Sequence, residues 1–117
     1  MNQEQFTDQE CKEIAGTILQ QLGGGRFCVM VGAKNLGFIR TDEGVAFVCK
    51  FMKNKSGMIN LKVIYDYGKD LYNMVFYSAR FCTKTLETKI KEKRFDGIFC
   101  DQLTEIFENF TGLYTSL

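Results

Sequence analysis

The sequence contains no histidine, no proline and no tryptophan among its 117 residues. Histidine is the side chain most often used as a general acid or base near neutral pH, and it is a common zinc ligand. Without it, a nucleophile would need a cysteine or serine beside a lysine or carboxylate, and no known signature of that kind occurs. We therefore expect a protein that is not an enzyme and that uses no cofactor and no metal.

Cysteine is present, but not in the spacing of a metal site or a disulfide framework. The five cysteines are widely spaced and never form a C-x-x-C pair. Each lies in or beside an apolar stretch, where free cysteine behaves as a small hydrophobic residue. We expect buried reduced thiols, with a reactive thiol or a disulfide as the alternatives. The cysteines are Cys11, Cys28, Cys49, Cys82 and Cys100.

Long apolar runs are also missing, since none approaches the roughly 18 residues that a membrane span needs. The first ten residues are polar and acidic, unlike a secretory signal. We therefore expect a cytoplasmic protein without membrane contact. The hydrophobic content of 45%, with eleven Phe and five Tyr, is enough for one core. The sequence predicts a single domain over residues 1–117.

Two segments have the pattern of helices. Thr7 followed by Glu10 forms a capping box, and Gly23 follows the last apolar residue of the first stripe. The second helix is expected from about Ile98, with Asp96 as a cap and a stop at Gly112. The apolar stripes are Cys11, Ile14, Ala15, Ile18 and Leu22 in the first, and Phe99, Leu103, Ile106, Phe107 and Phe110 in the second.

Between these helices the sequence predicts antiparallel strands. Strands are expected at residues 26–31, 38–40, 45–52, 59–67 and 71–81, with turns at 42–44, 53–57 and 68–70. Residues 83–94 are ambiguous, and we interpret them as a polar strand or loop. The predicted fold is α+β: a meander of four or five antiparallel strands, with both terminal helices packed on one sheet face.

Charge is unevenly distributed along the chain, although the net charge is only +1. Residues 1–22 carry four acids and one base, and residues 95–117 carry four acids and no base. Residues 23–94 hold fourteen Lys or Arg against six acids, a net charge of +8. This distribution predicts an acidic helical side and a basic sheet side, which would attract phosphates or acidic proteins. Alternatively, these cations only solvate an open face.

Three groups of residues are candidates for binding. Lys34 and Asn35 lie in a turn that starts at Gly32, where Asn35 tolerates positive φ and Lys34 would project. Tyrosines gather on the later hairpin, and Tyr is favoured where one end of the side chain is dry and the other wet; they also serve as cross-strand pairs that stabilise a sheet. The candidate tyrosines are Tyr65, Tyr67 and Tyr72, and the candidate cations are Lys84, Lys89, Lys91 and Arg94.

Several stretches resemble a family of small uncharacterised proteins encoded by tailed bacteriophages and integrative mobile elements. The matching stretches are Gln21-Leu22-Gly23-Gly24-Gly25-Arg26-Phe27, Gly32-Ala33-Lys34-Asn35, Asp70-Leu71-Tyr72-Asn73-Met74, Asp101-Gln102-Leu103-Thr104-Glu105-Ile106-Phe107 and Thr111-Gly112-Leu113-Tyr114-Thr115. The resemblance extends from about Thr17 to Leu117. It implies the cytoplasm of a bacterial host, and it carries over no catalytic residue and no cofactor.

The sequence leaves three functions open. The first is an accessory protein that binds a host or phage protein, for example as an inhibitor of a host enzyme or defence system. The second is a nucleic-acid-binding module that uses the basic sheet region, whose binding would weaken steeply with salt. The third is a structural protein that assembles as a homo-oligomer.

Overall fold

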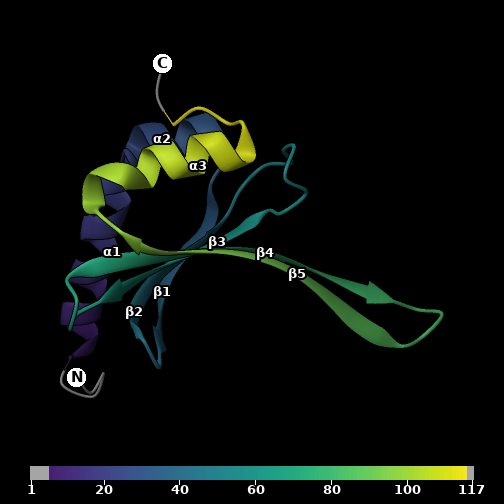
Figure 1. Cartoon of the computed structure of the whole chain (residues 1–117), viewed down its shortest axis with the longest axis horizontal. Helices are drawn as coiled ribbons and strands as arrows, with labels where there is room; N and C mark the ends of the chain where they lie inside the picture. Colours follow the sequence, from purple (N-terminus) through teal and green to yellow (C-terminus); the bar gives the residue numbers. More distant parts are fainter. Residues whose placement is uncertain (1–5, 116–117) are drawn as a thin grey trace.

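Three helices lie on one face of a five-stranded antiparallel sheet (Figure 1). The computed structural model describes residues 6–115. Its elements are α1 (Asp8–Leu22), α2 (Gly25–Val31), β1 (Lys34–Thr41), β2 (Gly44–Lys50), β3 (Asn60–Asp66), β4 (Leu71–Cys82), β5 (Glu87–Ile98), the 3-10 helix η2 (Cys100–Gln102) and α3 (Leu103–Thr111). The strands lie in the order β1-β2-β3-β4-β5, each antiparallel to the next. The α+β meander with flanking helices is confirmed.

Helix α1 begins and ends as its sequence predicts. The Glu10 amide donates to the Thr7 hydroxyl at 3.2 Å, and the Thr7 amide donates back to the Glu10 carboxylate at 3.1 Å. These bonds satisfy two amides that a helix start leaves free. The helix is capped at Gly23, whose amide donates to the carbonyl of Gln20. An ion pair of 2.7 Å between Asp8 and Arg40 connects the start of α1 to β1.

The segment expected as a strand at residues 26–31 is instead the short helix α2. Phe27 and Val31, four residues apart, lie on one side of the helix and are both fully buried. Periodicity alone does not separate a short apolar strand from a buried helical turn, and this explains the wrong prediction. The spacing of Phe27 and Val31, with Gly32 as a left-handed cap after them, is the signal for a helix.

Residues 83–94 are a turn and a polar strand, as expected, whereas the start of the last helix differs from expectation. Residues 83–86 form a turn, and β5 runs to Ile98, where the helix was expected to begin. Helix α3 begins only at Leu103, and Asp96 pairs with Arg94 instead of capping it. Phe99, expected in the buried stripe, is 61% exposed. The predicted end at Gly112 is confirmed.

One glycine is required by the sheet geometry at the β1–β2 turn. Gly44 has φ 149°, and a Cβ atom there would lie 2.1 Å from the carbonyl oxygen of Tyr65. Any larger residue would therefore push β2 away from β3.

The core lies between the helices and one face of the sheet. Alternate residues of β2, expected to face it, are buried: Val45, Phe47, Cys49 and the following Phe51. Phe107 of α3 is the centre of the aromatic contacts, with ring centroids 5.2 Å from Phe27, 5.1 Å from Phe51 and 5.9 Å from Phe76. These contacts fix α2 and α3 against the middle of the sheet.

The β4–β5 hairpin extends beyond the helices. Both strands have twelve residues, whereas β1 to β3 have seven or eight. Figure 1 shows the far half of this hairpin projecting away from the body. The radius of gyration, 14.4 Å, is larger than the about 13 Å expected for a compact chain of this length. We call residues 78–93 the arm.

Substituting Phe107 tests the packing of α3. The variant Phe107→Ala is expected to lower the free energy of unfolding by about 3–5 kcal/mol, because it leaves a cavity among three aromatic rings. Phe99→Ala is the matched control at an exposed position, with a change within about 0.5 kcal/mol. Urea unfolding of both variants is the measurement, and equal effects would contradict this description of the core.

Candidate functional site

One face of the arm is lined by cations. Lys89, Lys91 and Lys93 alternate along β5, and Arg80 on β4 lies directly opposite Lys89. Because side chains in a strand point to opposite faces in turn, these four residues share one face. It is the continuation of the face that carries Met74 and Phe76 under the helices. The whole arm holds five Lys or Arg against Glu87 and Glu92, a net charge of +3.

This arrangement is unfavourable for the isolated protein. Like charges directly opposite each other in a sheet are destabilising, as Arg80 and Lys89 are here. Lys91 and Lys93 face Ser78 and Phe76, and within the arm this face carries one carboxylate, that of Glu87, which lies opposite Cys82 and diagonal to Arg80. The Nζ atom of Lys93 lies 5.5 Å from the ring centroid of Phe95, a favourable position for a cation. The repulsion on this face would be relieved by an anionic ligand.

The opposite face of the arm is mainly apolar. Ala79 and Phe81 on β4 share it with Ile90 on β5, which lies opposite Ala79, and Tyr77 precedes them on the same face of the sheet. Phe81 is 57% exposed and Ile90 is 65% exposed. Thr88 and Glu92 are the polar residues of this face. The arm is therefore a two-sided ribbon, with cations on one side and uncovered apolar groups on the other.

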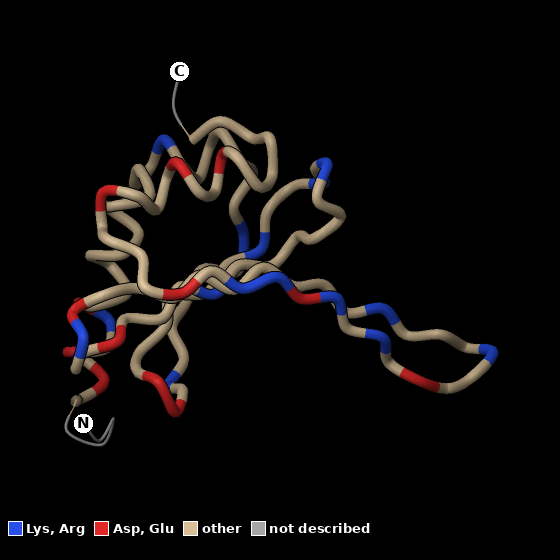
Figure 2. The backbone as a smooth tube through the Cα atoms, viewed as in Figure 1, with Lys and Arg blue, Asp and Glu red and all other residues tan. Residues whose placement is uncertain are grey.

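Charge is separated in a different way from that expected. Helices α1 and α3 carry acidic residues, as Figure 2 shows, and this part of the expectation holds. Cations, however, lie on both faces: Arg80, Lys89, Lys91 and Lys93 lie on the continuation of the helix-covered face, whereas the open face carries Lys34 opposite Lys50, Lys62 and Arg94. The sequence could not show this because the length of the hairpin beyond the helices was unknown.

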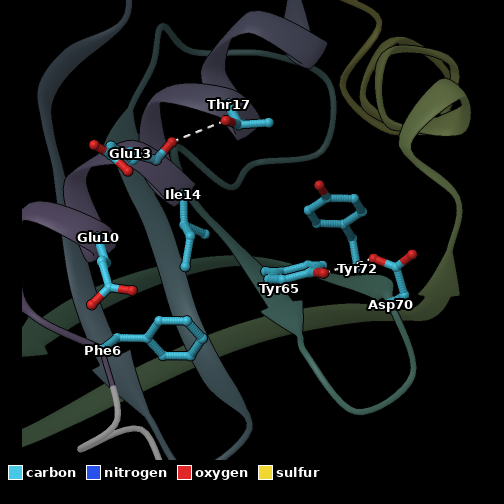
Figure 3. A pocket seen from close by; sticks show the side chains of 8 residues that line it. All are labelled: Phe6, Glu10, Glu13, Ile14, Thr17, Tyr65, Asp70 and Tyr72. Carbon is cyan, nitrogen blue, oxygen red and sulfur yellow. Dashed lines mark hydrogen bonds between the residues drawn. The ribbon is translucent and has the colours of Figure 1, made fainter.

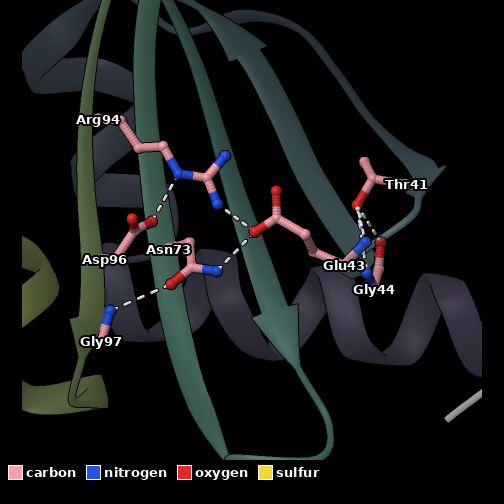
Figure 4. Close-up of polar contacts among 7 residues, drawn as sticks. All are labelled: Thr41, Glu43, Gly44, Asn73, Arg94, Asp96 and Gly97. Atoms are coloured by element: carbon pink, nitrogen blue, oxygen red, sulfur yellow. Dashed lines mark hydrogen bonds and ion pairs between the residues drawn. The ribbon is translucent and has the colours of Figure 1, made fainter.

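Arg94, a candidate cation, is engaged in ion pairs on the open face of the sheet (Figure 4). Its guanidinium pairs with Glu43 and, at 2.6 Å, with Asp96. Asn73 donates to Glu43 at 2.8 Å and accepts from the amide of Gly97 at 3.1 Å. Glu43 thus reaches from the β1–β2 turn past β3 to residues of β4 and β5. This network stabilises the sheet. Arg94 does not belong to the basic face of the arm.

The network shifts the pKa values of its members. A hydrogen bond from Arg94 is the largest effect that lowers the pKa of Glu43, and the same pair raises the pKa of Arg94. Both side chains are about one third exposed, so water screens the pair. Beside the network, Ala46, Ile64 and Val75 form a small buried cluster on the open face.

The candidate tyrosines lie near the β3–β4 turn, at the end of the sheet away from the arm. Figure 3 shows two of them, Tyr65 and Tyr72. Tyr65 and Tyr72, paired across β3 and β4, line a cleft of about 320 Å³ against α1. Tyr72 is buried, whereas Tyr67 is half exposed. The Tyr65 hydroxyl donates to Asp70 at 2.6 Å, and this bond, with some desolvation, raises the pKa of Tyr65 to about 12. The cleft is also lined by Phe6, Glu10, Glu13, Ile14 and Thr17.

The remaining candidates do not form a common site. Asn35 has the positive φ expected of it, 55°, and Lys34 is exposed at the start of β1. Three strands separate β1 from the β5 strand of the arm. Lys84 lies in the turn at the tip of the arm. The structure thus brings together Lys84, Lys89 and Lys91, while it adds Arg80 and Lys93, which the sequence reasoning did not single out.

All five cysteines are free, and their surroundings differ. Cys11 and Cys49 are buried as expected, and burial raises the pKa of Cys49 to about 12. Cys100 is exposed, contrary to expectation. Hydrogen bonds with Thr85 at the tip of the arm lower the pKa of Cys82.

Comparisons with known proteins add no family to this description. Neither the protein-family models, nor the curated proteins, nor the solved structures contain a match to the chain. Among residues 6–115, no group of three His, Cys, Asp or Glu side chains could hold a metal ion. No helix in the same range combines the length and apolar character required to cross a membrane.

The ion pair of Glu43 predicts a pH dependence of stability. Because the folded state lowers the pKa of Glu43, the pair stabilises the protein above the unfolded pKa of about 4.3, and this stabilisation is lost as the pH falls through the lower folded value. Glu43→Gln should therefore be less stable than wild type at pH 7, by about 0.2–1 kcal/mol as for exposed pairs.

The measurement is urea unfolding of both proteins between neutral pH and about pH 3. The difference should shrink toward acid. Asp42→Asn removes the same charge from the neighbouring position and is the control. A difference between wild type and Glu43→Gln that is constant over this range would show that the charge of Glu43 does not contribute.

Proposed function

We propose that this protein acts by binding nucleic acid, and that the basic face of the arm is its contact surface. The observation that carries the proposal is the alignment of Arg80, Lys89, Lys91 and Lys93 on one face of a ribbon that projects beyond the helices. Two-stranded β-ribbons bind duplex DNA in either the major or the minor groove. In the phage or mobile-element setting that the resemblance implies, this is an accessory protein that binds and does not catalyse.

The spacing of the cations suits a phosphate backbone. Residues two apart in a strand are separated by about 6.8 Å, so Lys89, Lys91 and Lys93 follow each other at that interval. Each DNA strand carries one phosphate per about 3.4 Å of helix axis. Lysines at this interval can each contact a separate phosphate of the duplex.

Lysines on an edge strand have a second role, because they hinder pairing with other chains. Charges of either sign serve that role, and alternating signs would avoid the repulsion between Arg80 and Lys89. The excess of four cations over the single carboxylate of Glu87 on this face therefore favours an anionic partner over protection of the edge alone.

Neutralising the arm should weaken nucleic-acid binding and its dependence on salt. In the triple variant Arg80→Gln, Lys89→Gln, Lys91→Gln, three phosphate contacts are lost, so the slope of log K against log salt should become shallower by up to about 3. The control Lys12→Gln, Lys50→Gln, Lys69→Gln changes the net charge equally at exposed sites away from this face. Fluorescence anisotropy with a labelled duplex between about 50 and 200 mM salt is the measurement.

The control variant should bind as wild type does. Equal weakening by both triple variants would mean that only net charge matters, and the basic face of the arm would lose its role. Absence of wild-type binding to any DNA or RNA at about 50 mM salt would refute the proposed function altogether.

A partner protein is the second candidate, and the exposed apolar face of the arm favours it. Phe81 and Ile90 are large and uncovered, as anchors of a protein interface are before binding. The variant Phe81→Ser, Ile90→Ser would abolish binding of a protein on this face and leave the salt dependence of DNA binding unchanged. Loss of DNA binding in this variant would instead assign both faces to nucleic acid.

A further inference from the structure

The tip of the arm holds an apolar residue in a position that disfavours it. Leu86 is the last residue of the turn at 83–86, and its φ of 57° lies in the left-handed region. A Cβ atom makes this conformation unfavourable, and Gly or Asn is the usual choice. Leu86 is also 76% exposed. Neither the backbone nor burial accounts for a leucine here.

The residues near Leu86 are of the kinds that contact a ligand. Lys84 lies two residues before Leu86 in the turn. Phe81 is also exposed, and it precedes Cys82, which forms the last β4–β5 pair with Glu87. The tip thus combines a bulky apolar group with a cation. Side chains of this kind are inserted between base steps by proteins that kink DNA from the minor groove.

The two faces of the arm favour duplex over single-stranded nucleic acid. Single-strand binding surfaces interleave cations with aromatic rings on which bases stack. In the arm, the exposed aromatic residue Phe81 lies on the face opposite Lys89 and Lys91. A duplex needs no such interleaving, because its backbone presents phosphates and its bases are stacked already.

We propose that the preferred ligand is double-stranded DNA and that Leu86 is a wedge that enters the base stack and bends the duplex. This inference rests on the proposed function, since the basic face of the arm must hold the backbone for the tip to reach the bases. The favourable contacts of the inserted side chain offset the free energy that unstacking the bases costs. The wedge therefore changes the shape of the DNA more than the affinity.

The test compares Leu86→Gly and Leu86→Ala with wild type on a duplex of about 30 bp that carries fluorescent dyes at both ends. Wild type should raise energy transfer between the dyes, as a kink of about 20–90° would. A 2-aminopurine placed along the duplex should brighten where the stack opens. Both variants should lose these signals while binding within about threefold of wild type, because the phosphate contacts remain.

Two controls keep the outcomes distinct. Leu36→Ala removes an exposed leucine of β1 and should leave bending unchanged. Leu86→Gly suits the left-handed backbone, so its melting temperature should equal or exceed that of wild type. A loss of bending in this variant therefore cannot come from unfolding.

The failures of the two proposals differ. Tight, salt-dependent binding without bending, or with bending that Leu86→Gly retains, would overturn the wedge and leave the proposed function intact. Stronger binding to the separated single strands than to the duplex would likewise overturn it. If wild type binds no nucleic acid, both proposals fall.

Discussion

The position of Phe76 determines how the rest of the molecule is arranged. Its ring centroid lies 4.5 Å from that of Phe110 and 5.9 Å from those of Phe95 and Phe107, so it connects α3 to β4 and β5. Phe76 is the last fully buried aromatic residue of β4, and the strand continues past it for six more residues. Where the helices end, the face that forms the core therefore becomes the basic face of the arm.

Because the arm begins where the core ends at Phe76, it can carry side chains that reduce the stability of the fold. The free energy of folding comes from the aromatic core and the helix stripes, and the exposed part of the arm adds little apolar burial. The body can thus tolerate opposed cations at Arg80 and Lys89 and a left-handed leucine at the tip. Features that reduce stability and recur within one projecting segment are typical of a surface shaped by its ligand.

Much of the body could be predicted from the sequence because its signals are local. The capping box at Thr7, the alternation of Phe47 and Cys49 in β2, and the stop at Gly112 each depend on nearby residues. The helix at Gly25–Val31 was missed because a short, mostly apolar segment fits a strand as well as a buried helix.

The candidate site was predictable only in part, because it depends on register. The sequence singled out Lys89 and Lys91, but only the pairing with β4 shows that Arg80 and Lys93 share their face. The same pairing places Arg94 on the other face, where Glu43 comes from a turn fifty-one residues earlier. No local pattern indicates an ion pair at that separation, and the tyrosines likewise proved to lie beside α1, far from the arm.

The most direct test of the central claim is a map of amide chemical-shift changes when duplex DNA is added to the labelled protein. We predict changes concentrated in residues 78–93, largest near Arg80, Lys89 and Lys91, while the cleft formed by Tyr65, Tyr72 and α1 stays unchanged. Changes centred on that cleft, or an unchanged spectrum at low salt, would contradict the claim that the arm is the functional surface.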